Sequence, residues 1–381
     1  MDAGSTVVLA RVSAGVPLVT VLLAARGLDV DVIIAGPSTD DASAAALGAD
    51  TVAVSDAAGG FDVRPLPGAE RGAADGEEAG LRLLSSGTTG APRATRWPWR
   101  LLTHGRAWDG GGSERWAIGY AAHSFAGVSA TCQALGRAAS LEFVRPTDLS
   151  APEPGAPELT VAAGTPSFWR MAAIATREES GFRRIGSLTM GGESVDQSLL
   201  DLVRESVAPR RITQIFGTTE LGTAILVDDE LPGLPEERRG HRLSNGAAFE
   251  VDGEKLLVST APGEPYAPTG DLVRLADGRV HVTGRVGVYV NVGGMKANPY
   301  RVTQVLQQHE EVLAARAYGM RSPVLGQVVA ADVVPRGAPE PRQLVAALKR
   351  YTGTVLEAHE RPQRINVVDD LAVAESGKVQ L

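Results

Sequence analysis

The sequence predicts an α/β protein with a large N-terminal domain and a small C-terminal domain. Over residues 1–55, short apolar runs of strand character alternate with helical patterns, as in a parallel sheet covered by helices. Between residues 247 and 283, short strands separated by Gly and Asp turns indicate a small, mostly antiparallel β subdomain. After Gly284 the expected order becomes β, α, β, β, α, β, which is a compact α+β unit. We therefore predict domains at residues 1–285 and 286–381.

The large domain is expected to consist of layered α/β subdomains. The first should contain strands at residues 6–9, 30–34 and 51–54 and helices at residues 16–25 and 40–47. Residues 56–79 are rich in Ala, Gly, Asp and Glu and indicate a loop. A strand at residues 81–84 begins further α/β units that continue to about residue 227. The β subdomain follows, with strands at residues 247–251, 255–259, 272–275 and 280–283.

The small domain is predicted to begin with a hairpin-like stretch that ends near Asn291. Its remaining elements are helices at residues 299–308 and 341–351 and strands at residues 314–318, 327–334 and 364–368. The sequence contains no internal repeat, so a solenoid or an array of repeated units is not expected.

Composition excludes several classes of protein. The net charge is −8, no block of five or six Lys and Arg residues occurs and aromatic residues make up 5%, so we expect no nucleic-acid binding. Cys132 is the only cysteine, which rules out an intramolecular disulfide or a cysteine-based zinc site and is typical of a reducing cytoplasm. The apolar residues 16–25 are followed by Arg26 and Asp29, and no run reaches the roughly 18 apolar residues of a membrane span.

The clearest functional signal is a loop of small, hydroxylated and charged residues that follows the strand at residues 81–84. Glycines let a backbone turn so that its N–H groups face an anion, while Ser and Thr add hydroxyl donors and Arg93 adds positive charge. This chemistry suits the β- and γ-phosphates of ATP, although the spacing differs from a Walker loop; the plainer alternative is a polar turn. The loop comprises Ser85, Ser86, Gly87, Thr88, Thr89, Gly90, Ala91, Pro92 and Arg93.

Acidic residues occur in two later motifs. Glu220 ends the segment Phe216-Gly217-Thr218-Thr219-Glu220 and offers the kind of ligand that Mg²⁺ prefers beside phosphates, or it is an ordinary carboxylate at the start of a helix. Asp271 ends Thr269-Gly270-Asp271, which either presents an acceptor to a ligand or forms a turn between two strands. The pair Gly284-Arg285 follows.

Glycine-rich and terminal segments form a further group of candidates. Gly191-Gly192-Glu193 has two adjacent glycines, which allow another group to approach the backbone closely, and Gly294 lies in a stretch that is typical of a hairpin turn. Lys378 follows Gly377 near the end of the sequence and could be a solvated tail lysine. His123 is a lone histidine and Phe168 is an apolar residue beside Trp169, so the residues themselves favour a structural histidine and a core phenylalanine.

Taken in order, these motifs resemble those of the adenylate-forming superfamily, which includes acyl- and aryl-CoA synthetases, peptide-synthetase adenylation domains and luciferases. The resemblance extends from about residue 81 to the end of the sequence. It implies a mobile C-terminal domain and use of ATP and Mg²⁺ on a small carboxylic acid. It also implies CoA, or the phosphopantetheine of an acyl carrier protein, as an acceptor.

The resemblance assigns a role to each candidate residue. Residues 85–93 would hold the ATP phosphates, and Gly191, Gly192, Glu193, Phe216 and Gly217 would line the adenine site. Thr219 would contact the α-phosphate, Glu220 would hold Mg²⁺, Asp271 would bind the ribose hydroxyls and Arg285 would bind ribose or phosphate. Lys378 would bridge the substrate carboxylate and the α-phosphate, Gly294 would shape the pantetheine tunnel, His123 would gate the acyl pocket and Phe168 would line it.

The sequence departs from the superfamily pattern at four places. Arg93 replaces the usual Lys, and the segment before residue 85 is short, which leaves the acid undetermined. Gly287 occupies the hinge position, where Asp or Lys is usual, and Tyr300-Arg301 stands where relatives often carry a carboxylate. The expected reaction is formation of an acyl-adenylate and pyrophosphate, then transfer to a thiol. Transfer to an amine or a small inorganic nucleophile, and a non-catalytic nucleotide-binding scaffold, remain alternatives.

Overall fold

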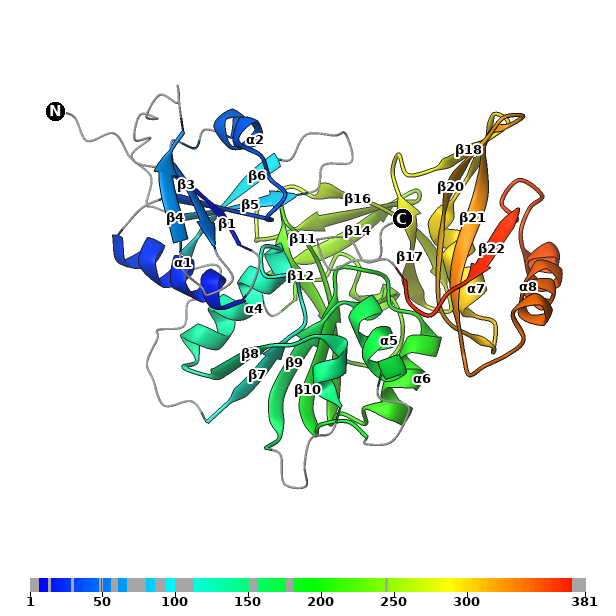
Figure 1. Cartoon of the computed structure of the whole chain (residues 1–381), viewed down its shortest axis with the longest axis horizontal. Coiled ribbons are helices and arrows are strands. Elements are labelled where there is room, and N and C mark those ends of the chain that lie inside the picture. Colours follow the sequence, from blue (N-terminus) through cyan, green and yellow to red (C-terminus); the bar gives the residue numbers. More distant parts are fainter. Residues whose placement is uncertain are drawn as a thin grey trace.

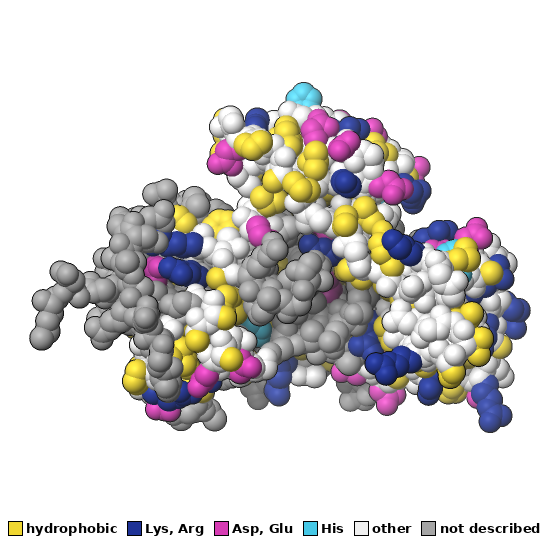
Figure 2. All heavy atoms as spheres, turned by 90° about the horizontal axis from the view of Figure 1, so that it is seen from above, with side chains coloured by type: hydrophobic (Ala, Val, Ile, Leu, Met, Phe, Trp, Pro, Cys, Tyr) yellow, Lys and Arg dark blue, Asp and Glu magenta, His cyan; other side chains and the backbone are white. Residues whose placement is uncertain are grey.

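The computed structural model describes residues 7–12, 15–28, 31–47, 49, 51–55, 61–66, 80–85, 93–99, 113–150, 157–175, 181–243 and 246–371. Figure 1 shows two α/β layers and a β subdomain on one side of the molecule and a separate α+β unit at the other end. The predicted fold class is confirmed by this arrangement. Charged side chains of both signs are interspersed over the described part of the face seen in Figure 2.

The first sheet has six strands in the order β4-β3-β1-β2-β5-β6. Successive side chains of its strands point to opposite faces of the sheet. Leu9 and Ile33 belong to one apolar cluster, and Ala10 and Ile34 belong to another on the opposite side. Its elements are β1 (Val7–Arg11), α1 (Gly15–Leu28), β2 (Asp31–Ala35), α2 (Asp41–Ala46), β3 (Thr51–Ser55), β4 (Phe61–Pro65), β5 (Gly80–Ser85) and β6 (Arg93–Pro98).

One part of this sheet corrects the sequence-based expectation. Strand β4 lies inside residues 56–79, which were expected to be a loop, and pairs antiparallel with β3. It is an edge strand whose Val63 is 62% exposed, so it buries few side chains and has little of the alternating hydrophobicity by which strands are recognised.

The second sheet has the order β12-β11-β10-β9-β7-β8 and is parallel except for β12. Trp169 is fully buried beneath it, together with apolar residues of the helices that cover the sheet. Its elements are β7 (Arg115–Ile118), α4 (Phe125–Gly136), β8 (Ser140–Phe143), η1 (Pro146–Leu149), β9 (Leu159–Gly164), α5 (Pro166–Ala175), β10 (Ile185–Gly191), α6 (Gln197–Ser206), β11 (Arg211–Thr218) and β12 (Gly222–Val227).

The β subdomain is an antiparallel sheet in the order β13-β17-β16-β15-β14, as expected. Phe249 and Val258 are fully buried in an apolar cluster that this sheet shares with Ile225 and Val227 of the neighbouring strand β12. Its elements are β13 (Leu234–Pro235), η2 (Glu236–Arg238), β14 (Ala248–Asp252), β15 (Lys255–Ser259), β16 (Ala267–Ala276) and β17 (Arg279–Arg285).

The C-terminal α+β unit has the expected order of elements and a core of its own. Helix α7 begins after Asn298, whose side chain accepts hydrogen bonds from the backbone N–H groups of Tyr300 and Arg301. Residues of α7, α8 and the sheet share one apolar cluster. The elements are β18 (Val290–Val292), β19 (Met295–Ala297), α7 (Pro299–Gln307), β20 (Val312–Ser322), β21 (Gly326–Pro335), α8 (Pro341–Val355) and β22 (Arg364–Val367). The boundary between residues 285 and 286 stays a prediction.

Among the residues described, no helix is both long and apolar enough to cross a membrane.

Candidate active site between the domains

A cavity of about 1160 Å³ lies where the second sheet, the β subdomain and the C-terminal unit meet. The structure brings together at this cavity residues that lie far apart in the sequence. Predicted residues from the second sheet that line it are Gly192, Glu193, Phe216, Gly217, Thr219 and Glu220. The β subdomain contributes the predicted residues Asp271 and Arg285.

Thr219 and Glu220 lie at the turn that joins β11 to the antiparallel strand β12. The register shifts between Phe216 and Gly217, which redirects the strand as it reaches the cavity. The backbone N–H of Leu221 donates to the Thr218 hydroxyl at 3.1 Å and closes the turn. Glu220 is exposed at its tip, so its carboxylate is accessible from the cavity.

The predicted phosphate loop joins the two strands of an antiparallel hairpin. Ser85 at the end of β5 pairs directly with Arg93 at the start of β6, so the strand expected before the loop is present and a second strand follows it. Residues 86–92, which include Ser86, Gly87, Thr88, Thr89 and Gly90, lie outside the described residues, as does Lys378.

The glycine segment after β10 requires small residues. A Cβ atom at Gly191 would lie 2.6 Å from the Ile215 carbonyl oxygen, so the two neighbouring strands can pair only if residue 191 lacks a side chain. The Glu193 carboxylate accepts hydrogen bonds from the Ser167 N–H at 2.8 Å and the Ser167 hydroxyl at 2.6 Å. Glu193 therefore fixes the first turn of α5 beside the cavity.

Asp271 and Arg285 form an ion pair at the edge of the cavity. They face each other across β16 and β17, with the Arg285 Nε 3.0 Å from the Asp271 Oδ1. Arg285 also donates to the Thr269 carbonyl at 3.3 Å. The Asp271 side chain is only 12% exposed, whereas that of Arg285 is 35% exposed. The pair thus presents both a hydrogen-bond acceptor and a positive charge to a ligand.

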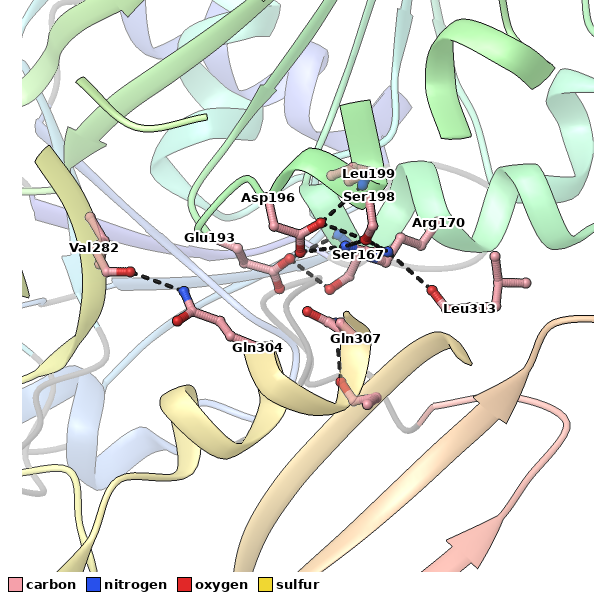
Figure 3. A network of polar contacts seen from close by, with 11 residues as sticks. Ser167, Arg170, Glu193, Asp196, Ser198, Leu199, Val282, Gln304, Gln307 and Leu313 are labelled. Atoms are coloured by element: carbon pink, nitrogen blue, oxygen red, sulfur yellow. Dashed lines mark hydrogen bonds and ion pairs between the residues drawn. The ribbon is translucent and has the colours of Figure 1, made fainter. Parts of the chain in front are cut away.

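Helix α7 of the C-terminal unit forms the opposite wall. The Gln304 side chain donates to the Val282 carbonyl at 3.0 Å (Figure 3). The Asn298 side chain donates to the Thr283 carbonyl at 2.9 Å. Tyr300 also lines the cavity; burial raises the pKa of its phenol, Arg285 opposes this shift, and Asp271 and Glu193 add to it. The phenol is therefore uncharged at neutral pH.

Arg170 on α5 joins the two domains from the other side of the cavity. Its guanidinium, on a residue that is 4% exposed, donates to the Leu313 carbonyl at 3.1 Å and forms an ion pair with Asp196 (Figure 3). Burial alone would raise the pKa of Asp196, but Arg170, the Ser198 hydroxyl and the Leu199 N–H together hold that pKa below its usual value. The Arg170 guanidinium therefore forms an ion pair within the N-terminal domain and also donates a hydrogen bond to the C-terminal unit.

Gly294, His123 and Phe168 are predicted residues that, like Gly191, do not line this cavity. Gly294, with φ of +90°, lies in the exposed turn between β18 and β19. His123 precedes Ser124, the N-cap of α4. Phe168 is buried in the core, where Cβ atoms at Gly119 and Gly164 would approach its ring to 2.4 and 2.5 Å. The assigned roles of all three stay predictions.

The position of Glu220 fits a Mg²⁺ ion whose other ligands would come mainly from the phosphates of a bound nucleotide and from water. Within the described part of the chain, no group of three or more His, Cys, Asp and Glu side chains could hold a metal. Mg²⁺ commonly takes only one or two protein carboxylates and completes its shell with phosphate oxygens and water. A single accessible carboxylate at the cavity satisfies that requirement once a nucleotide supplies the remaining oxygens.

The C-terminal unit matches a known family in sequence. Residues 301–378 match the family described as AMP-binding enzyme C-terminal domain. A medium/long-chain-fatty-acid–CoA/3-oxocholest-4-en-26-oate–CoA ligase of Mycolicibacterium smegmatis is 35% identical over 169 residues, which are 42% of this chain and 30% of the relative. An oxalate–CoA ligase of Arabidopsis thaliana is 31% identical over 113 residues, or 29% of this chain and 22% of that relative. The chain thus spans less than a third of the length of these curated relatives.

Similarity of fold extends over almost the whole chain. The anthranilate CoA ligase AuaEII, solved with anthranoyl-AMP, superposes with a TM-score of 0.71 at 17% identity and covers 98% of this chain and 86% of its own. ATP-bound MatB from Rhodopseudomonas palustris gives a TM-score of 0.65 at 18% identity and covers 99% of this chain and 87% of its own. The whole chain thus shares the fold of these solved structures, and its residues 301–378 match the AMP-binding enzyme C-terminal domain family in sequence.

Proposed function

We propose that the protein activates a small carboxylic acid with ATP, forms an acyl-adenylate with release of pyrophosphate, and transfers the acyl group to a thiol. The observation that carries this proposal is the convergence of the predicted nucleotide residues on one cavity. They come from the segment after β10, from the end of β11 and the turn that follows it, and from the β16–β17 pair. The cavity of about 1160 Å³ exceeds the roughly 300–1000 Å³ of common ligand pockets, so it has space for a nucleotide and a small acid.

The nucleotide would lie along the N-terminal side of this cavity. Phe216 would contact adenine, Asp271 would accept hydrogen bonds from the ribose hydroxyls, and Thr219 would donate to the α-phosphate. The loop of residues 85–93 would hold the β- and γ-phosphates. Mg²⁺, held by Glu220 and the phosphates, would neutralise charge on the departing pyrophosphate.

The first half-reaction needs charge stabilisation more than proton transfer. A carboxylate oxygen attacks the α-phosphorus, the bond from that phosphorus to the bridging oxygen breaks, and pyrophosphate leaves with the electron pair. Because a carboxylic acid is already ionised at pH 7, no general base is required. Arg285, which is paired with Asp271, would place a positive charge beside the reacting phosphate and would stabilise negative charge in a partly water-excluded site.

The second half-reaction consumes the adenylate. A thiolate of CoA, or of phosphopantetheine on a carrier protein, attacks the acyl carbon, the bond to the phosphate oxygen breaks and AMP leaves. The proton of the thiol passes to solvent.

Lys378 would bridge the substrate carboxylate and the α-phosphate in the first step. Leu371 lines the cavity, and Lys378 follows it by seven positions. Seven extended residues reach roughly 23–25 Å, so the tether is long enough for this role. The Gly294 turn would serve the second step after the C-terminal domain has rotated.

Acid-dependent exchange of labelled pyrophosphate into ATP tests the first half-reaction. A panel of short-chain, aromatic and dicarboxylic acids should contain at least one that raises exchange above the acid-free control. A folded protein that shows no exchange with any acid would contradict the proposal. Tight ATP binding in that protein would instead favour the non-catalytic scaffold.

Product analysis separates the possible acceptors. Mass spectrometry of reactions supplied with CoA, a carrier protein or amines should detect a thioester. An amide, or an adduct with a small inorganic nucleophile, would support the alternative acceptor.

For location we propose the cytoplasm. The support is that Cys132 is the single cysteine of the sequence, so that no intramolecular disulfide can form. Cell fractionation that recovers the protein outside the cytoplasm would contradict this proposal.

A further inference from the structure

Trp97 connects two segments that the proposed function requires to act together. It lies in β6, four residues after Arg93, in the strand that leaves the predicted phosphate loop. Its indole N–H donates to the Thr219 carbonyl oxygen at 2.9 Å, across 122 positions of sequence. Thr219 precedes Glu220 in the turn between β11 and β12. One strand therefore borders the loop at one end and is bonded to the Thr219–Glu220 turn near its other end.

Neighbouring residues fix the orientation of the indole. The ring centroids of Trp97 and Phe125 are 5.2 Å apart and the rings are inclined at 46°. On the other side, a Cβ atom at Gly222 would lie 2.7 Å from the Trp97 Cη2 atom, so the ring fits only because residue 222 is glycine. Gly222 has φ of +73°, a conformation that glycine adopts readily. The indole is therefore held between α4 and the end of the Thr219–Glu220 turn.

The turn does not depend on Trp97 for its own formation. The Leu221 N–H closes it on the Thr218 hydroxyl, and Thr218 pairs with Gly222 in the strand ladder. Losing the indole bond should leave the turn folded but free to shift relative to the β5–β6 hairpin. The bond thus sets the position of one segment against another, which is a separate task from holding the fold together.

We infer that Trp97 is a positioning residue for adenylation: its indole N–H holds the Thr219–Glu220 turn in register with the β5–β6 hairpin. This inference rests on the proposed function, because the hairpin and the turn are the segments assigned to the ATP phosphates and to Mg²⁺. The turn then meets the α-phosphate and the metal while the hairpin loop holds the other phosphates. The contribution belongs to binding of MgATP and has no part in recognition of the acid.

Trp97→Phe is the informative variant because it keeps a ring against Phe125 and removes the N–H donor. Loss of one hydrogen bond of ordinary strength predicts a KM for MgATP that is raised about tenfold in pyrophosphate exchange. The KM for the acid should stay unchanged, and the melting temperature should fall by only a few degrees. Trp116→Phe is the matched control: that indole also makes one hydrogen bond, to Glu114 at 2.8 Å, on β7 and outside the lining of the cavity.

The outcomes separate the inference from the function on which it rests. A raised KM for MgATP in Trp97→Phe alone supports the positioning role. Equal KM values in the two variants, or a change confined to melting temperature, would overturn it. If the wild type shows no exchange with any acid, the proposed function fails. Calorimetric binding of MgATP then decides the inference: weaker binding in Trp97→Phe supports it, and unchanged binding, or none in the wild type, overturns it.

Discussion

The C-terminal unit has two surfaces that differ in their relation to the cavity. Helix α7 and the start of β20 lie against the N-terminal domain, and their side chains line the cavity. The β18–β19 hairpin with Gly294 lies outside the lining, and its Met295 is 55% exposed. The superfamily pattern predicts a role for Gly294 on the second surface, yet only the first surface is in contact with the proposed ATP site.

Among the described residues, the first surface, which we call the docked surface, contacts the N-terminal domain mainly through hydrogen bonds to backbone carbonyls. Gln304 and Asn298 donate to carbonyls of β17, and Arg170 donates to the Leu313 carbonyl. The Leu313 side chain, 1% exposed, clusters with Ala173 and Leu202 of the N-terminal domain. Because the unit has its own core, these contacts can break without unfolding it.

This difference suggests that the two surfaces serve different half-reactions. We infer that the orientation seen here serves acid activation and that a rotation near Gly287 would bring the hairpin to the cavity for thiol transfer. Gly287 has φ of +84° and no atoms near the position of a Cβ, so it has the conformational freedom that a hinge requires.

The largest effect is expected from a residue that both orientations need. Asp271→Asn removes a charged acceptor from the cavity wall and the ionic partner of Arg285. Losing a charge-assisted hydrogen bond of about 2 kcal/mol predicts a roughly thirtyfold fall in kcat/KM for both half-reactions. Asp201→Asn on the exposed side of α6 is the control and should leave both rates unchanged. Equal rates in Asp271→Asn and wild type would exclude Asp271 from the site.

The docked surface can be weakened without touching the cavity lining. Leu313→Ala removes a buried side chain from the interface, which predicts a loss of about 2–3 kcal/mol from docking and at least a tenfold slower adenylation. Thioester formation from a supplied acyl-adenylate should not slow. Val324→Ala, at a residue that is 88% exposed, is the control.

The orientation of the two domains in Leu313→Ala can also be measured without an activity assay. Spin labels at Glu205→Cys on α6 and Lys349→Cys on α8 lie on exposed positions of the two domains, and the native Cys132 is buried. Leu313→Ala should broaden and shift the distance between the labels. An unchanged distance distribution would show that Leu313 does not hold the domains in this orientation.

The hairpin surface should affect only the second step. Gly294→Val imposes a β-branched side chain on a backbone with φ of +90° and places it on the hairpin face. We expect transfer to a thiol to slow about tenfold, given a strain of about 1–3 kcal/mol, while pyrophosphate exchange is unchanged. Gly337→Val, with φ of +82° in the connection before α8, carries the same strain elsewhere and should leave both steps intact. A slower pyrophosphate exchange reaction in Gly294→Val would contradict the claim that the hairpin surface acts only in thiol transfer.

The smallest expected effect is a pH-dependent change in the melting temperature of an Asp196 variant. The pKa of Asp196 is depressed below its ordinary value of 3.8, so its ion pair with Arg170 stabilises the protein fully above that value. The stabilisation is lost as pH falls through the lower, folded-state pKa. Asp196→Asn should therefore lower the melting temperature by a few degrees at pH 7 and by less near pH 3. A difference that grows toward low pH would contradict this assignment.

The regular elements could be predicted where hydrophobic periodicity was strong. The helix expected at residues 299–308 is observed at Pro299–Gln307, because Asn298 and Pro299 are a strong helix-start signal. The edge strand β4 was missed, since it buries little and lacks that periodicity.

The candidate site was predictable to the extent that it lies in short motifs. Glu193, Glu220, Asp271 and Arg285 all line the cavity. The contacts of Trp97 and Arg170 could not be predicted from the sequence. Trp97 binds the Thr219 carbonyl 122 positions away, Arg170 binds the Leu313 carbonyl 143 positions away, and both contacts form only in the folded chain. Periodicity and local motifs hold no information on such distant contacts.

Transfer of oxygen from the acid to AMP tests the central claim most directly. The acid identified by exchange is prepared with oxygen-18 in its carboxylate and incubated with ATP, Mg²⁺ and the thiol acceptor. Attack on the α-phosphorus predicts one labelled oxygen in the phosphate of AMP, with pyrophosphate unlabelled. Labelled orthophosphate together with ADP would show attack on the γ-phosphorus and would contradict the account.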